Sequence, residues 1–218
     1  MSGASPRPSV RTAVLNGMQK AYSSYQKMSG DSWPMTPEFF IATYVAKELK
    51  KTADPCLVTL EANIKNTLTA AGAQRPGPSA SYIRGSGNFD IVLSYKMNKP
   101  RAIIEVKRLN VAKAKLIEKD VKRVCVAVSD SKRNGGSLKF GIFAFLTRHK
   151  EPKAKHNNAK HRIEEHLKNI EKECRGFAVG CTAKMHKTKI IEVDKDNAAW
   201  TVSAIFITAK SVKNNKAI

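Results

Sequence analysis

Three ionisable residues interrupt two apolar stretches in the middle of this chain. Asp90 lies in the stretch GNFDIVLSY, and Glu105 and Lys107 lie in the stretch RAIIEVKR. Stretches this rich in Phe, Ile, Val and Leu predict β-strands, and residues two apart in a strand point to the same face. Glu105 and Lys107 therefore share a face, and Asp90 joins them if it lies on the neighbouring strand of the same hairpin. Two carboxylates and one ammonium group at one spot suit a hard divalent cation with a water molecule beside it.

A plainer alternative is a surface hairpin with a cross-strand ion pair, which contributes at most about 1 kcal/mol to stability. The residues that flank the three charges argue against it, because nearly all of them are apolar: Phe89, Ile91, Val92, Leu93, Ile103, Ile104 and Val106. Such a pattern is typical of strands that are buried on both faces. Charges inside such strands are costly unless they are paired or bind a metal. The pattern therefore favours the metal-site interpretation.

Asp90, a gap of fourteen residues and then Glu105-Val106-Lys107 resembles the motif of the PD-(D/E)XK nuclease superfamily. That superfamily includes many restriction endonucleases, Holliday-junction resolvases and phage exonucleases. Phe89 stands where the name of the superfamily has proline, a position that varies among its members. The resemblance implies an α/β, restriction-endonuclease-like fold with a core of helix, three strands, helix and strand, in which a mixed sheet is flanked by helices.

The hydrophobic pattern around the motif predicts elements in that order. Apolar residues at helical spacing over residues 57–71, followed by Gly72, predict the first helix of the core. Residues 111–128 predict the second helix, and residues 138–146 predict a buried strand. The core should therefore span about residues 57–146.

Further elements are expected on both sides of this core. The pattern predicts helices over residues 10–28, 36–51 and 158–173, a short strand over 82–84, and a hairpin made of 190–193 and 200–208. Thr36 would be the N-cap of the second of these helices, with Pro37 at its first position. The expected organisation is a disordered segment over residues 1–9, a single nuclease domain over 10–209 and a basic tail over 210–218.

The resemblance also implies roles for the residues of the motif. Asp90, Glu105 and the backbone carbonyl of Val106 would bind Mg²⁺, for which Mn²⁺ can substitute. Lys107 would orient the attacking water and help to deprotonate it.

Many members of the superfamily carry a further glutamate on the first helix, pointing at the metal. Glu61 is the matching residue here, and it would be catalytic and a metal ligand; Glu48 is the less favoured substitute. The alternative for Glu61 is an ordinary glutamate in the first turn of a helix, where the helix dipole favours a negative charge.

The charge of the chain indicates its partner. With 39 Lys and Arg against 18 Asp and Glu, the formal net charge is +21. So basic a chain implies a polyanion, most often nucleic acid, because neutralising phosphates releases condensed counterions. Ribosomal and chromatin proteins are equally basic, so the charge selects a class of partner and not an activity. The basic residues expected to contact DNA follow the motif: Arg108, Lys113, Lys115, Lys119, Lys122, Arg123, Lys132 and Arg133.

The expected function is a Mg²⁺-dependent nuclease that hydrolyses DNA phosphodiester bonds. With no signal-like or membrane-spanning segment in the sequence, we expect a cytoplasmic location. The oligomeric state stays open, a homodimer included. Cys174, Cys181 and His186 match no common zinc-site spacing. Two alternatives remain: a nucleic-acid-binding protein on the same fold without catalysis, and a basic RNA-binding or ribosome-associated protein.

Overall fold

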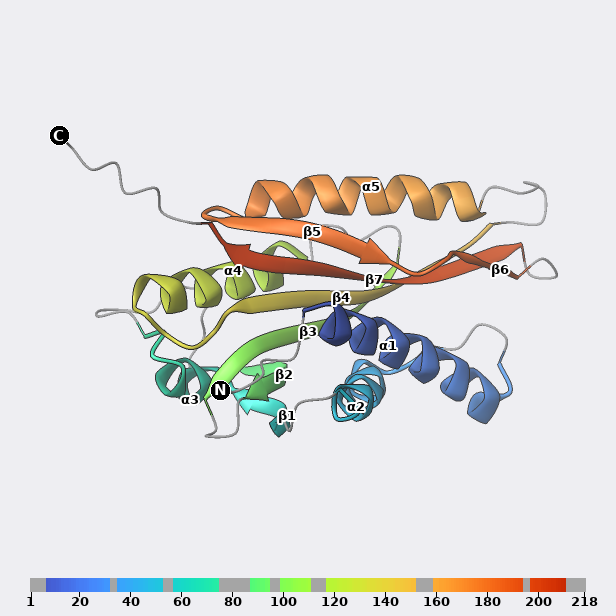
Figure 1. The fold of residues 1–218 in the computed structure, drawn as a ribbon. Helices are drawn as coiled ribbons and strands as arrows, with labels where there is room; N and C mark the ends of the chain where they lie inside the picture. The colour runs from blue at the N-terminus through green and yellow to red at the C-terminus, as the bar shows by residue number, and fades with distance from the viewer. Residues whose placement is uncertain are drawn as a thin grey trace.

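The computed structural model describes residues 7–31, 35–52, 57–74, 87–94, 99–110, 117–151, 159–193 and 197–210. Within these ranges, five helices and seven strands follow one another along the chain (Figure 1). The helices are α1 (Arg7–Ser29), α2 (Glu38–Leu49), α3 (Ile64–Ala70), α4 (Ile117–Arg133) and α5 (Ala159–Phe177). The strands are β1 (Leu57–Asn63), β2 (Asn88–Ser94), β3 (Pro100–Asn110), β4 (Phe140–Lys150), β5 (Cys181–Lys187), β6 (Ile191–Val193) and β7 (Ala198–Ala209).

The strands form one mixed sheet in the order β1-β2-β3-β4-β7-β5, with β6 also paired to β7. Strands β3 and β4 are parallel, and the other neighbouring strands are antiparallel. A parallel pair needs a crossover connection, and α4 provides it between β3 and β4. The start of α4 therefore lies close to the end of β3 that follows Glu105 and Lys107.

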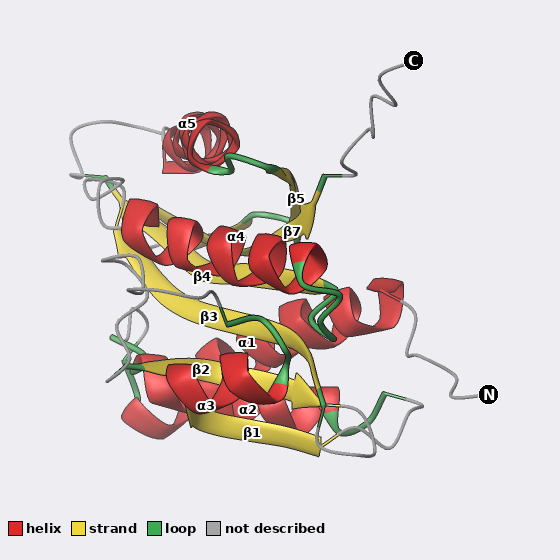
Figure 2. Cartoon of the chain, turned by 90° about the vertical axis from the view of Figure 1, so that its left-hand side faces the viewer, coloured by secondary structure: helices red, strands yellow, loops and turns green. Residues whose placement is uncertain are grey.

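Helices cover both faces of the sheet. In Figure 2, α3, α4 and α5 lie on one side of the strands, and α1 and α2 lie on the other. Each face has its own core: Ile103 and Phe143 belong to the first, and Ile104 and Ile142 belong to the second. The central apolar residues of β3 and β4 alternate between the two cores, so both strands are buried on both faces.

Gly17 lets α1 and α2 approach each other closely. A Cβ atom at this position would lie 2.5 Å from the Cα atom of Val45 and 2.9 Å from its backbone nitrogen. Only a residue without a side chain fits there without moving one of the two backbones. The pair of helices is thus held as one layer on its face of the sheet.

The sequence predicted the α/β class, the mixed sheet and most of these elements. The two N-terminal helices, the helix α5 and the hairpin of β6 and β7 are present. Helix α1 begins at Arg7, inside the segment expected to be disordered, and Pro37 takes the N-cap position of α2 that was expected for Thr36. Helix α4 begins at Ile117 and continues to Arg133, further than the prediction that ended at residue 128.

The prediction of one helix over residues 57–71 is wrong for its first half. Leu57–Asn63 forms β1, which pairs with β2, because Val58, Thr59 and their neighbours gain more from this pairing than from a helical turn. The helix begins only at Ile64, where the side chain of Asn63 accepts a hydrogen bond from the backbone N–H of Asn66 at 3.0 Å. It ends before Gly72, which has a φ of +64°.

Some predictions fall outside the described residues: the strand over residues 82–84, most of the segment over 1–9 and the tail after Lys210. Strand β5 was not predicted at all. No described helix has the length and apolar character needed to cross a membrane. Cys125, Cys174 and Cys181 are free and buried, as expected for thiols of the core.

Candidate functional site

Acidic side chains from three neighbouring strands lie in one row across the sheet. The register pairs Ile91 of β2 with Ile104 of β3, so one step further along both strands Asp90 lies opposite Glu105. On the other side of β2, Glu61 of β1 lies between two residues that pair with Ile91 and Phe89. The structure therefore brings together Glu61, Asp90 and Glu105, with Lys107 two residues further along β3.

The carboxylate of Asp90 completes the hydrogen bonding of β3. Its Oδ2 atom accepts a hydrogen bond from the backbone N–H of Val106 at 2.6 Å. The backbone N–H of Arg108, two residues on and therefore on the same side of the strand, donates to Oε1 of Glu38 at 3.0 Å. Two carboxylates thus take the place of a strand partner where the pairing with β2 ends.

Glu38 and Asp120 hold the ammonium group of Lys107 between them. The Nζ atom of Lys107 lies 3.3 Å from Oε2 of Glu38 and 3.8 Å from Oδ2 of Asp120. Glu38 comes from the first turn of α2, and Asp120 comes from the first turn of α4. The site is therefore built where β2 and β3 meet the beginnings of two helices.

Arg123 neutralises Glu105. Its Nε and one terminal nitrogen lie 3.0 and 2.8 Å from Oε1 of Glu105, and the terminal nitrogen lies 2.7 Å from Oδ1 of Asp120. Glu105 is only 1% exposed, so this pairing offsets the high cost of burying its charge. The sequence predicted that Arg123 would contact DNA, whereas the structure places its guanidinium group inside the acidic cluster.

The surroundings shift the pKa of each central group. Burial raises the pKa of Asp90, against the opposing effects of the Val106 N–H and Lys107. Burial and then the charge of Asp90 raise the pKa of Glu105 well above its ordinary value, against the opposing effect of Arg123. Burial lowers the pKa of Lys107, but Asp120, Glu38 and the other carboxylates outweigh it and raise that pKa. Lys107 therefore stays cationic at neutral pH, where it can donate hydrogen bonds and cannot accept a proton.

Glu61 lies on strand β1, whereas the sequence had predicted that it would lie on a helix. It has a φ of +50°, a left-handed conformation that is uncommon for a residue with a side chain. Its carboxylate accepts a hydrogen bond from the side chain of Asn88 at 3.4 Å, and its charge contributes to the raised pKa of Asp90. Glu48, the less favoured substitute, pairs with Lys20 and Lys51 about 15 Å along α2 from Glu38. Glu48 is therefore not part of the site.

The other basic residues predicted to contact DNA occupy different places. Arg108 donates to the carbonyl of Thr36 at 3.4 Å, beside the start of α2. Lys119 is exposed on the first turns of α4, and Lys122 pairs with Glu118. Lys132 and Arg133 lie at the far end of that helix, roughly 14 Å along its axis from Arg123. Lys113 and Lys115 fall outside the described residues.

Sequence reasoning missed Glu38 and Asp120. Each lies in the first turn of a helix, at positions where acidic residues are common for their effect on the helix dipole alone. Glu38 could have been identified from its position in the first turn of the helix that precedes the first strand of the core. Because residues 57–71 were taken as the first helix of the core, only Glu48 was considered on the helix that directly precedes β1.

The donor set suits a sparsely ligated hard cation. Mg²⁺ prefers carboxylate oxygens, is often held by one or two of them and keeps several water molecules. Asp90 and Glu105 supply such oxygens from adjacent strands, and burial first, then neighbouring carboxylates, raises the pKa of both groups. Across the described ranges, however, no group of three or more His, Cys, Asp or Glu residues is arranged to hold a metal. Two protein carboxylates and water are thus the set that these residues offer.

Comparison with known proteins gives no further information about the site. No family model, no curated protein and no solved structure matches this chain.

Proposed function

We propose that this chain is a metal-dependent nuclease that hydrolyses phosphodiester bonds in DNA, on a restriction-endonuclease-like fold. The observation that carries the proposal is the meeting of Asp90 and Glu105 on adjacent strands beside a cationic Lys107. The element order α2, β1, α3, β2, β3, α4 and β4 supports it, because it differs from the order of the core that the sequence resemblance implies only by the short helix α3 between the first two strands.

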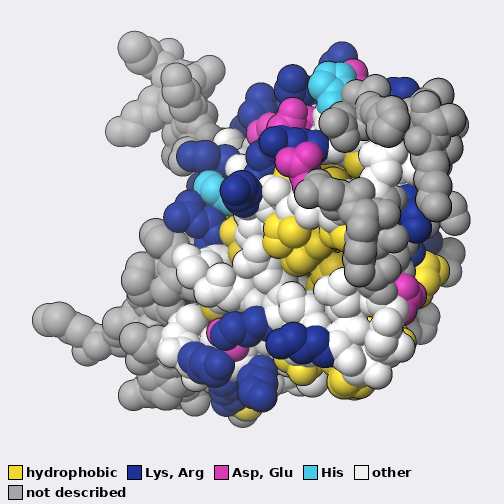
Figure 3. Space-filling view, turned by 90° about the vertical axis from the view of Figure 1, so that its right-hand side faces the viewer, with side chains coloured by type: hydrophobic (Ala, Val, Ile, Leu, Met, Phe, Trp, Pro, Cys, Tyr) yellow, Lys and Arg dark blue, Asp and Glu magenta, His cyan; other side chains and the backbone are white. Residues whose placement is uncertain are grey.

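The charge distribution supports a polyanionic substrate. The chain has a net charge of +21, yet four carboxylates gather around Lys107 and Arg123: Glu38, Asp90, Glu105 and Asp120. On the face shown in Figure 3, Lys and Arg side chains gather above and below a strip of hydrophobic side chains, with some Asp and Glu side chains among them. A basic chain attracts DNA, and the acidic cluster would need a cation between it and a phosphate.

In this mechanism Asp90 and Glu105 would hold Mg²⁺. The ion would supply an acidified water molecule and stabilise negative charge on the phosphate. Lys107, fixed by Glu38 and Asp120, would donate hydrogen bonds to the attacking water or to a phosphate oxygen. Because Lys107 stays protonated, it would not itself accept the proton of the water.

The direct test is cleavage by the purified chain. Labelled duplex and single-stranded DNA are incubated with the protein over a range of Mg²⁺ concentrations and in EDTA. Cleavage that rises with Mg²⁺ and stops in EDTA is the expected result. Binding of DNA without cleavage of any form, with Mg²⁺ or Mn²⁺, would instead favour the second candidate, a nucleic-acid-binding protein without catalysis. The internal pairing of Glu105 with Arg123 is the observation that favours this second candidate.

Glu38 and Glu61 should affect the reaction in different ways. Glu38→Gln removes the charge that holds Lys107 and the Arg108 N–H, so the rate at saturating Mg²⁺ should fall roughly 10- to 100-fold through lost positioning. Glu61→Gln should mainly raise the Mg²⁺ concentration needed for half-maximal rate, because it removes negative charge beside Asp90. Measuring the rate against Mg²⁺ concentration separates the two effects.

Glu48→Gln is the matched control, since Glu48 lies at the other end of α2 and pairs only with Lys20 and Lys51 among the described contacts. It should leave both the maximal rate and the Mg²⁺ dependence unchanged. If Glu38→Gln behaves like this control, Glu38 is a helix-start residue without a role in the reaction.

A further inference from the structure

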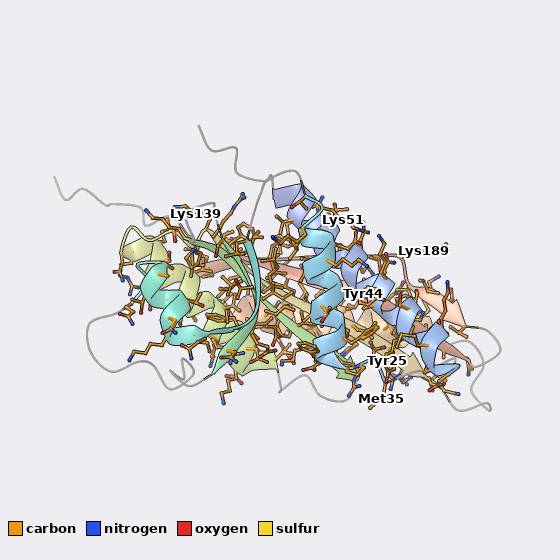
Figure 4. All side chains as sticks on the ribbon, turned by 90° about the horizontal axis from the view of Figure 1, so that it is seen from below. Tyr25, Met35, Tyr44, Lys51, Lys139 and Lys189 are labelled. Carbon is orange, nitrogen blue, oxygen red and sulfur yellow. The ribbon has the colours of Figure 1, made fainter. Side chains whose placement is uncertain are left out.

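Aromatic rings follow the outer surface of α1 and α2. Tyr25 of α1 lies edge-on against Phe40 of α2, with ring centroids 5.3 Å apart, and the rings of Phe40 and Tyr44 are 4.9 Å apart. All three side chains are half-buried, and Figure 4 shows Tyr25 and Tyr44 on the outer side of the two helices. We call Tyr25, Phe39, Phe40 and Tyr44 the aromatic strip. Because Phe40 contacts both Tyr25 and Tyr44, these three rings are held in place before any ligand arrives, whereas Phe39 is exposed.

Exposed apolar side chains concentrate at one end of the strip. Among the described residues, six large hydrophobic side chains are exposed, and three of them lie where α1 ends and α2 begins. These three are Met28 at 70%, Met35 at 53% and Phe39 at 61% exposure. Apolar groups gathered on a surface in this way mark a place where something binds.

The strip begins at the candidate site. Phe39 directly follows Glu38, whose carboxylate holds the Lys107 ammonium group and the Arg108 N–H. From there Phe40 and Tyr44 follow one turn apart, about 6 Å along the helix axis. A ligand that lies along the strip would therefore end at Lys107.

The charge around the strip identifies the class of ligand. Lys27 is in the last turn of α1, Lys47 is in the last turn of α2, and Lys51 follows α2; all three are exposed. Figure 4 shows Lys51 beyond Tyr44 at the far end of α2. A second copy of this chain, with its own charge of +21, would be repelled by this surface, whereas a polyanion would be attracted.

We propose that the aromatic strip stacks the unpaired bases of a DNA strand, whose phosphates meet Lys27, Lys47 and Lys51 and whose end leads to Lys107. Rings of this kind stack on nucleobases of any sequence, but only where the faces of the bases are free. In a duplex those faces are covered by neighbouring bases. That the strand leads to Lys107 rests on the proposed function. The inference also narrows the class of substrate to single-stranded DNA, or DNA with a single-stranded segment.

The test is binding without catalysis. Fluorescence anisotropy in EDTA gives the affinity of the full chain for a labelled oligothymidylate, for an abasic strand of the same length and for a blunt duplex. Phe39→Ala and Tyr44→Ala should each weaken binding of the oligothymidylate roughly 5- to 100-fold, the measured range for the loss of one stacked base. Binding of the abasic strand and of the duplex should not change, because neither presents free base faces.

Two further variants keep the test independent of folding. Tyr44→Phe retains the ring and should bind like the unaltered chain, and Val179→Ala removes an exposed apolar side chain beyond the end of α5, away from the strip.

Equally weakened binding of all three ligands, or unchanged binding of the oligothymidylate, overturns the proposal. So does a change of sedimentation without a change in binding, which would identify a protein interface. A chain that shows the predicted binding pattern but cleaves nothing would refute the nuclease and leave the strip intact.

Discussion

Asp90→Asn and Glu105→Gln should each lower Mg²⁺-dependent cleavage at least about 1000-fold, because a divalent ion supplies several kcal/mol of transition-state stabilisation. DNA affinity should stay the same or rise, since Asp90→Asn lowers the negative charge of the site and Glu105, at 1% exposure, is buried against Arg123. Rates are measured in single turnover with the protein in excess, and affinities are measured in EDTA. Glu48→Gln, outside the site, serves again as the control. Retained cleavage by both variants would remove the metal from the mechanism.

Glu105→Gln should also raise the melting temperature, because the pKa of Glu105 is raised in the folded chain. The ordinary value is 4.5, and in the folded chain burial and then Asp90 raise the pKa of Glu105 well above it. Protonation therefore stabilises the folded chain, and this stabilisation is full below pH 4.5 and is lost as the pH rises through the folded pKa. In EDTA, the melting temperature of Glu105→Gln should thus exceed that of the unaltered chain by a margin that grows over this range. An unchanged margin from acid to neutral pH would show that Arg123 fully offsets the burial of this charge.

Lys107→Ala should lower the rate of cleavage at saturating DNA at least about 100-fold, through the loss of water positioning and of charge stabilisation. Lys119→Ala is the matched comparison, because Lys119 is an exposed lysine on the neighbouring first turns of α4. It should mainly weaken binding and reduce the slope of log affinity against log salt by up to about one. Equal effects of the two changes on the saturated rate would make Lys107 only another phosphate contact.

The strands that carry the site were predictable because burial on both faces leaves a clear signature. Residues 88–94, 100–110 and 140–150 are apolar at most positions, so Asp90, Glu105 and Lys107 stand out among the apolar residues next to them. Strands β1 and β5 lie at the edges of the sheet, where one side of each strand is free and half of the side chains face water. Their sequences lack that signature, and β1 was taken for a helix because Leu57, Leu60 and Ile64 also fit a helical spacing.

The residues that surround the motif could not be predicted from spacing. Glu38 lies 69 residues before Lys107 in the chain, and Arg123 lies 18 residues after Glu105. Their places depend on where α2 and α4 begin relative to β3, which is set by helix packing, including the close approach at Gly17, and by the length of the crossover. Sequence reasoning therefore found the two central carboxylates and the lysine, but it assigned Arg123 to the solvent and DNA.

Because Arg123 pairs with Glu105, this chain should be able to fold before it binds metal. In many small metalloproteins the ligands repel one another until the ion arrives, so a chelator unfolds them. Here a guanidinium group from α4 and an ammonium group from β3 already pair with acids of the cluster. The ion that we propose would then be a reagent that the folded chain takes up and releases, and a preparation stripped of metal should keep its structure and regain activity when Mg²⁺ is added back.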